Sequence, residues 1–298
     1  MVLEVDVTRT LRAVVLTLGT LLSLNPAPAA VQASRMPIVA DNIIVERDVI
    51  YGRPDGAAVL ADIAYPEVRK SLPAILYVHG GRWTSGERIG RLQLYVEDWA
   101  KAGYFAMTID YRLAGTAPAP AGYQDLLTAI RWIHAHADKY SIDPNRLYIV
   151  GNSSGGHVVS LAGTLGDGPY AKVGGWKDAS SNVRAVISIA APYELNTLSW
   201  GNLWAPLDAR TPEELEKARR IASPIHQITP NSTPMLIIHS DDDESVPVQQ
   251  AHDMVTALKK AGIKHRFVHY KDRGHMRLTD EVVREMLEFI AEIERKGE

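Results

Sequence analysis

A serine flanked by glycines, between an apolar run and a helix-like run, constrains this chain more than any other feature. Residues 147–150 predict a buried strand, residues 151–157 read Gly-Asn-Ser-Ser-Gly-Gly-His, and residues 158–165 predict a helix. The glycines allow a sharp turn that holds Ser153 with its hydroxyl exposed, and free amides at the helix start favour negative charge nearby. Gly-x-Ser-x-Gly alone is weak evidence, because small residues often fill such turns. With suitable partners elsewhere in the chain, Ser153 is predicted to be a nucleophile.

Strands that alternate with helices predict an α/β fold. Two β-rich runs, 43–50 and 57–64, surround a turn at 52–56 and predict an antiparallel hairpin. Further strands are expected at 74–78, 104–109, 146–150, 184–189, 235–239 and 265–270, and helices at 90–102, 123–140, 248–261 and 279–296. This order predicts a mostly parallel eight-stranded sheet with helices on both faces, in a single domain over 42–298.

The stretch 192–224 is irregular and holds Trp200, Trp204 and a short charged helix at 211–220. It lies between two predicted strands, on the side where open α/β sheets bind ligands. Tryptophans in an exposed loop are costly unless they pack on something. We therefore expect a small cap insertion here; the alternative is an ordinary long connection.

The N-terminus has the features of a targeting segment. Arg9 and Arg12 precede an apolar run at 13–24, and small residues at 27–29 or 31–33 could form a cleavage site. Residues 1–33 are therefore predicted to be a signal peptide and the start of a linker, and the protein to be secreted or periplasmic. An upstream start-site extension or an amphipathic arm is the alternative. Later segments are too short or too polar for a membrane span.

Net charge and cysteine content exclude several classes of partner and site. A net charge of −3 gives no electrostatic reason to expect nucleic acid. The absence of cysteine excludes disulfides, a cysteine nucleophile and thiolate metal ligands.

A glycine-rich sequence, His79-Gly80-Gly81-Arg82-Trp83, follows the strand at 74–78. Acyl transfer needs N–H donors aimed at the developing oxyanion, and a glycine-rich strand end lets backbone amides point inward. The amides of Gly81, Arg82 and Ser154 are the predicted donors. A plain turn is the alternative for the glycine pair, and His79 is expected only to brace the loop.

Near the C-terminus, four consecutive acids at 241–244 follow a strand, and His275 follows the last strand. A carboxylate at a strand end can orient a histidine and stabilise its imidazolium. Chemistry alone leaves the choice of acid open, and the acids could also form a metal-binding or solvated loop. The spacing between Asp243 and His275 fits one helix plus one strand, which places both at neighbouring strand ends. Ser153, Asp243 and His275 follow the chain order of α/β-hydrolases.

These motifs together resemble the α/β-hydrolase superfamily, in its carboxylesterase/lipase group. The matching pieces are His79-Gly80-Gly81-x-Trp83-x-x-Gly86, Asp110-Tyr111-Arg112-Leu113-Ala114, 120–125 before a helix, Gly151-x-Ser153-x-Gly155-Gly156-His157, Ala222-Ser223-Pro224, His239-x-x-x-Asp243-x-x-Val246-Pro247 and Gly274-His275. The similarity is to the hormone-sensitive-lipase-like and the acetyl-xylan/feruloyl-esterase-like branches. It implies a small-molecule substrate, a short-chain carboxylic ester, hydrolysed without a cofactor or a metal. It also selects Asp243 over Asp241 and Asp242.

Three positions depart from the family pattern: Arg82 replaces a third glycine, Gly115 a proline, and Ser240 a glycine. The mechanism implied is attack by Ser153 with His275 as base and Asp243 as its orienting acid. A neutral imidazole base predicts activity that rises through roughly pH 6–7.

Two other functions remain open from the sequence. An arylformamidase of the kynurenine-formamidase type would share the His-Gly-Gly strand end and the triad, whereas a non-catalytic binding protein would keep only the fold. A prolyl-oligopeptidase-type peptidase fits less well, because no propeller precedes the catalytic domain. Trp83, Trp200 and Trp204 are predicted pocket walls, which would suit aryl or sugar esters, although tryptophans more often pack than bind.

Overall fold

The structure, a computed structural model, describes residues 39–67, 69–90 and 94–295. The predicted signal peptide, residues 1–33, lies outside this part of the chain. Among the residues described, none of the helices is both long and apolar enough to cross a membrane.

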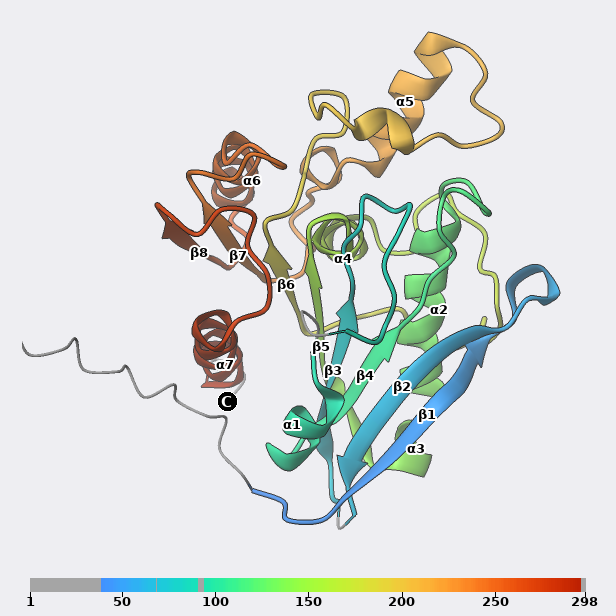
Figure 1. Ribbon diagram of the computed structural model, residues 1–298, viewed down its shortest axis with the longest axis vertical. Helices are drawn as coiled ribbons and strands as arrows, with labels where there is room; N and C mark the ends of the chain where they lie inside the picture. The colour runs from blue at the N-terminus through green and yellow to red at the C-terminus, as the bar shows by residue number, and fades with distance from the viewer. Residues whose placement is uncertain (1–38, 68, 91–93, 296–298) are drawn as a thin grey trace, which may run out of the picture. The chain divides into compact units, whose positions relative to one another are not determined.

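The described residues form one eight-stranded sheet with the order β1-β2-β4-β3-β5-β6-β7-β8 (Figure 1). Within it, β2 alone runs antiparallel to its neighbours, and all other neighbouring pairs are parallel. The strands are β1 Ile43–Gly52, β2 Val59–Pro66, β3 Leu72–Val78, β4 Phe105–Ile109, β5 Ile142–Asn152, β6 Ala185–Ile189, β7 Met235–Ser240 and β8 His265–Tyr270. The predicted hairpin and the mostly parallel sheet are therefore confirmed.

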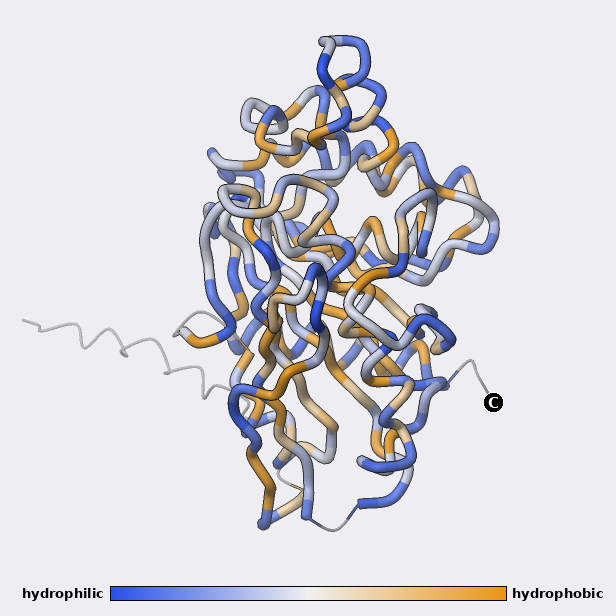
Figure 2. The backbone as a smooth tube through the Cα atoms, turned by 90° about the vertical axis from the view of Figure 1, so that its right-hand side faces the viewer, coloured by the Kyte–Doolittle hydropathy of each residue, from blue (hydrophilic) through white to orange (hydrophobic). Residues whose placement is uncertain are grey.

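Helices cover both faces of the sheet, as predicted. One buried cluster joins the sheet to α2, α4 and α6, and a second joins its other face to α1 and α7. The α-helices are α1 Val96–Lys101, α2 Ala121–Ala135, α3 Ala137–Tyr140, α4 Ser154–Leu165, α5 Pro212–Ala222, α6 Gln249–Lys260 and α7 Asp280–Arg295. Hydrophobic segments concentrate in the central strands, whereas the outer turns are hydrophilic (Figure 2). This burial of continuous apolar strands is typical of a parallel sheet covered on both sides.

Two helix predictions were wrong in extent. Among the described residues of the helix expected over 90–102, only Val96–Lys101 form an α-helix. Ahead of it, the backbone N–H of Arg88 donates to the Asp110 carboxylate (2.6 Å), which holds the chain in a non-helical path. The helix expected over 123–140 breaks at His136, whose φ of −107° and ψ of 13° are not helical. The ring of His136 there donates to the Trp132 carbonyl (2.8 Å).

The predicted cap segment, 192–224, contains α5 and the short 3-10 turn Gly201–Leu203, and a second 3-10 turn, Pro224–His226, begins at its last residue. Helix α5 stands beyond the carboxyl ends of the parallel strands (Figure 1). It begins with a capping box between Thr211 and Glu214, which satisfies free amides of its first turn. Its last residue, Ala222, accepts a hydrogen bond from the buried His157 ring of α4 (2.7 Å), so the segment is fastened to the helix that follows Ser153.

Candidate active site

Ser153 occupies a strained turn between β5 and α4. Its φ of 54° and ψ of −125° lie in a region that L-residues rarely adopt, which marks a site where the fold enforces strain. The flanking glycines are required by close approach: a Cβ on Gly151 would lie 2.4 Å from the Gly155 carbonyl, and one on Gly155 would lie 2.2 Å from the Val78 carbonyl oxygen. Ser154 begins α4, so its amide has no helical acceptor one turn earlier. The expected strand–serine–helix turn is therefore present, with Ser153 at its strained position.

The glycine-rich segment after β3 forms a tight loop beside Ser153. Gly81 and Arg82 have φ values of 120° and 55°. A Cβ on Gly81 would lie 2.0 Å from the Ser85 carbonyl oxygen, so only glycine fits there. Within the described part of the chain, the amides of Gly81 and Arg82 have no hydrogen-bond acceptor. Both amides are therefore available to donate to an oxyanion. Arg82 adopts the positive φ of this turn although it stands where the family has a third glycine.

Asn152 fixes this loop to the elbow, a role that the sequence reasoning missed. Its side-chain oxygen accepts from the Gly80 amide (3.1 Å) and from the Tyr77 hydroxyl (2.8 Å). The loop and the nucleophile turn are thereby held in one register. The position between Gly151 and Ser153 could have been noticed as a polar residue at a buried strand end, but its partners are distant in sequence.

His79 braces the loop, as expected, through contacts with Tyr111 and Gly80. Its ring stacks on Tyr111 at a centroid distance of 4.4 Å, and its Nδ1–H donates to the Gly80 carbonyl (2.7 Å). Burial lowers the pKa of His79, so the ring is neutral at neutral pH. The motif requires glycine at position 86, because a Cβ on Gly86 would lie 2.2 Å from the His79 imidazole.

The structure pairs His275 with Asp243. The Nδ1–H of His275 donates to both carboxylate oxygens of Asp243, at 2.8 and 3.0 Å. This bond assigns the Nδ1–H tautomer and leaves Nε2 as the basic nitrogen. The neighbouring acids point elsewhere: Asp242 accepts from the Ser240 hydroxyl and the Gly274 amide, and Asp241 pairs with His269.

Asp243 is buried but remains ionised. Burial raises its pKa, and this effect is outweighed by hydrogen bonds from His239, from His275 and from the Val246 amide, so the pKa is lowered well below its ordinary value. The Ser245 amide donates to the same carboxylate (2.9 Å). A buried carboxylate with this many donors keeps its charge and its orientation. It can therefore stabilise an imidazolium at His275.

Ser153 and His275 line one cavity of about 290 Å³. Its other lining residues are Tyr77, His79, Gly80, Gly81, Arg82, Gly86, Asn152, Ser245 and Arg277. The predicted nucleophile, the base and two predicted oxyanion donors thus share a single hollow. The arrangement can hold an acyl group against a serine hydroxyl with amides at its carbonyl oxygen.

The three tryptophans predicted as pocket walls instead form a buried cluster. Trp83, Trp200 and Trp204 are 4%, 6% and 3% exposed, and none lines the cavity described above. Trp83 contacts both others and the His157 ring at centroid distances of 4.9 to 5.5 Å. Trp200 also donates to the Ser245 carbonyl (2.9 Å). In this geometry the tryptophans join the cap segment, the glycine-rich loop and the acid loop by packing, and they do not contact the cavity.

The sequence of this chain matches a known family over most of the segments that form the cavity. The model of the BD-FAE family matches residues 61–258, about two thirds of the chain. This chain belongs to the BD-FAE family. The match covers the glycine-rich loop, the nucleophile turn and the acid loop, and it ends before His275.

Two of the curated proteins similar to this BD-FAE chain come from Mycobacterium tuberculosis. Esterase LipC is 32% identical over 227 residues, which are 72% of this chain and 55% of LipC. The probable carboxylic ester hydrolase LipM is 28% identical over 195 residues, which are 63% of this chain and 45% of LipM. The chain spans about half the length of these relatives.

Two solved structures place the BD-FAE chain among α/β-hydrolases. A truncated carbohydrate esterase from gut microbiota is 26% identical, with a TM-score of 0.66 over 84% of this chain and 96% of that one. The butyrate-bound esterase of Thermogutta terrifontis is 23% identical, with a TM-score of 0.71 over 85% of this chain and 95% of that one. The predicted α/β-hydrolase fold is confirmed.

Proposed function

We propose that this chain is a serine hydrolase of short-chain carboxylic esters that works through an acyl-enzyme. The observation that carries the proposal is the shared cavity, in which Ser153 on a strained turn faces the same space as a His275 already oriented by a buried, ionised Asp243. Esterase names among the relatives support the same reaction class.

In the proposed reaction, Nε2 of His275 takes the proton of the Ser153 hydroxyl as Oγ attacks the ester carbonyl carbon. The amides of Gly81, Arg82 and Ser154 donate to the oxyanion. When the tetrahedral intermediate collapses, the imidazolium gives its proton to the leaving alcohol and the acyl group stays on Ser153. The imidazole then takes a proton from a water whose oxygen attacks the acyl-enzyme carbonyl carbon. As the bond between that carbon and Ser153 Oγ breaks and the acid leaves, the imidazolium returns its proton to Oγ.

A small acyl group on a carbohydrate or aryl alcohol is the proposed substrate class. The cavity of about 290 Å³ favours small acyl groups. The printed title of the gut-microbiota neighbour, a carbohydrate esterase, supports the sugar alcohol. Export of the protein, proposed from the N-terminal sequence alone, would fit an extracellular polymer. N-terminal sequencing of secreted material would test it, since an intact residue 1 would contradict cleavage.

Hydrolysis of p-nitrophenyl acetate, butyrate and octanoate tests the proposal. We expect acetate and butyrate to be cleaved faster than octanoate by at least about tenfold in kcat/KM, because each misfit methylene costs on the order of 1–3 kcal/mol in a shaped pocket. N-formylkynurenine serves as the formamide comparison. Faster cleavage of this amide than of every ester would replace the proposal with an arylformamidase, and no cleavage of any substrate would favour a binding protein.

Two arginines at the cavity predict a preference for anionic esters. Arg82 and Arg277 line it, and in the described part of the chain no carboxylate lies within ion-pair distance of either guanidinium. Arg82 lies over the Trp200 ring at 5.6 Å, which directs its side chain along the cap segment. A negative charge on the substrate would find two guanidinium groups that have no ion-pair partner among the described residues.

We therefore expect p-nitrophenyl hemisuccinate to be cleaved with a higher kcat/KM than p-nitrophenyl valerate, a neutral ester of similar length. Arg277→Gln should lower kcat/KM for hemisuccinate about 5- to 30-fold, as expected for the loss of a charge-assisted contact, and change valerate less than about twofold. Arg277→Lys should retain part of the preference. Equal loss on both esters would show that Arg277 only supports the loop.

A further inference from the structure

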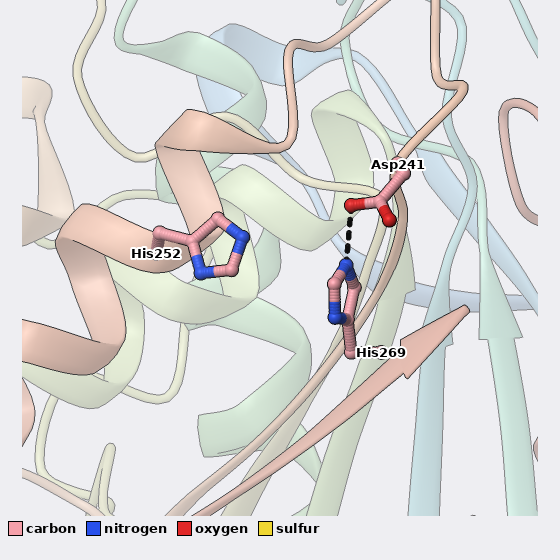
Figure 3. A group of neighbouring side chains, drawn as sticks. All are labelled: Asp241, His252 and His269. Atoms are coloured by element: carbon pink, nitrogen blue, oxygen red, sulfur yellow. Dashed lines mark hydrogen bonds and ion pairs between the residues drawn. The ribbon is translucent and has the colours of Figure 1, made fainter. Parts of the chain in front are cut away.

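Outside the candidate active site, three ligand-type side chains converge between the sheet and α6 (Figure 3). Asp241 follows β7, His252 lies on α6 and His269 lies on β8. One ligand atom from each lies within 4.8 Å of the others. Asp241 and His269 are exposed and His252 is half-buried, so an ion could reach them from solvent.

His269 points from β8 toward α6, and His252 points from α6 toward the same face of the sheet, so the two imidazoles meet. Strand β8 is the edge strand, and its alternate residues Phe267 and His269 face α6. The Phe267 ring stacks on His269 at 5.3 Å and 16°, and meets His252 edge-on at 5.3 Å and 82°. One aromatic ring therefore orients both histidines. Arg266, on the other face, is tied to glutamates of α7 and adds no cation here.

One hydrogen bond in this group, between His269 and Asp241, would be replaced by bonds to an ion, and His252 has no ring hydrogen bond to lose among the described residues. His269 Nε2 is bonded to the Asp241 carboxylate, and the Asp241 amide is bonded to the Tyr270 carbonyl at 2.9 Å, which fixes the carboxylate's backbone. Neither ring nitrogen of His252 has a hydrogen-bond partner among the described residues. A half-buried imidazole that faces an imidazole–carboxylate pair, with no partner of its own, is the arrangement that a bound cation would complete.

We propose that Asp241, His252 and His269 form a binding site for a divalent transition metal, with Zn²⁺ as the probe. Two imidazoles and one carboxylate match the ligand preference of zinc and its neighbours, whereas Ca²⁺ and Mg²⁺ prefer oxygen ligands. Donor atoms around tetrahedral zinc lie roughly 3.3 Å apart, from bond lengths of about 2.0–2.1 Å. Side-chain rotation has to close the longer separations by about 1.5 Å or less and to open the hydrogen-bonded His269–Asp241 pair, and water would fill the fourth position.

The proposed ion has a structural consequence for the triad segments. Asp241 lies two residues before Asp243, and His269 lies six residues before His275, so the ion would tie the loop of the acid to the strand that leads to the base. His252 would add α6 to the same tie. The site is distinct from the catalytic pair, because Asp243 and His275 bond to each other and not to these three residues.

Isothermal titration of the chelator-treated chain with ZnCl₂ tests the proposal. We expect one zinc per chain, and a rise in Tm of roughly 2–4 °C at a zinc concentration about ten times the dissociation constant. His252→Ala and Asp241→Asn should each weaken binding at least about tenfold. Asp241→Asn keeps an oxygen acceptor for His269, so it preserves the local hydrogen bond while removing the charge.

His265→Gln is the matched control. It lies on β8, four residues before His269 and on the same face, and its ring is already bonded to the Ile263 carbonyl. This variant should bind zinc as the unaltered chain does, and circular dichroism should show all variants folded. Absence of zinc binding, or binding that persists unchanged in both His252→Ala and Asp241→Asn, would overturn the proposal.

Discussion

Replacing Ser153 by alanine is expected to lower kcat for p-nitrophenyl butyrate by roughly 10⁴- to 10⁶-fold. The reason is that the acyl-enzyme cannot form without the hydroxyl, while the oxyanion amides and the cavity still bind ester. KM should therefore change much less than kcat. Burst-phase and steady-state release of p-nitrophenol would measure both.

Ser160→Ala is a matched control for this change. Ser160 lies two turns further along α4, and its hydroxyl donates to the Gly156 carbonyl (2.7 Å), away from the cavity. Its loss should leave kcat within a few-fold. Because alanine at 153 retains the same strained backbone, the Tm of Ser153→Ala should stay close to that of the unaltered chain. Turnover by Ser153→Ala close to that of the unaltered chain would contradict the role of Ser153 as nucleophile.

The sequence predicted the parts of the site that depend on local backbone chemistry. The glycines at 151 and 155 are necessary because neighbouring carbonyls leave no room for a Cβ, and that requirement is readable as a motif. The resemblance to a known family was needed to choose Asp243 among four adjacent acids. The structure gives the physical basis: Asp243 alone of Asp241, Asp242 and Asp243 is buried against His275.

Other features depend on contacts between residues distant in sequence. Asn152 matters because Gly80 and Tyr77 come within hydrogen-bonding distance of it, and no local pattern encodes that meeting. The same holds for His252 and His269, which α6 and β8 bring together. The positions of Trp83, Trp200 and Trp204 in the sequence are equally compatible with a pocket wall and with a packed cluster. The packing of residues 192–224 onto α4 places them in a cluster.

Replacing Asp243 by asparagine is expected to lower kcat about 10⁴-fold, the loss that accompanies the wrong histidine tautomer in serine hydrolases. A carboxamide can present its NH₂ to Nδ1 of His275, which would favour a proton on Nε2, and that nitrogen could then no longer accept the proton of Ser153. Glu244→Gln is the matched control, because Glu244 is an exposed acid next to Asp243 and belongs neither to the Asp243–His275 pair nor to the proposed zinc site. Similar losses of kcat in both variants would show that activity depends on the charge of the acidic loop and not on the Asp243–His275 pair.

The same substitution should change how stability depends on pH. Asp243 has a folded-state pKa below its unfolded value because His239, His275 and backbone amides donate to the charged form, outweighing burial. Such a group stabilises the fold above its unfolded pKa, about 3.9, and this contribution is lost as pH falls below that value toward the folded pKa. Asparagine does not titrate. The difference in Tm between the unaltered chain and Asp243→Asn should therefore be largest above about pH 5 and shrink progressively in acid. Curves of Tm against pH that run parallel from pH 7 to pH 3 would show that Asp243 is not held ionised by its hydrogen bonds.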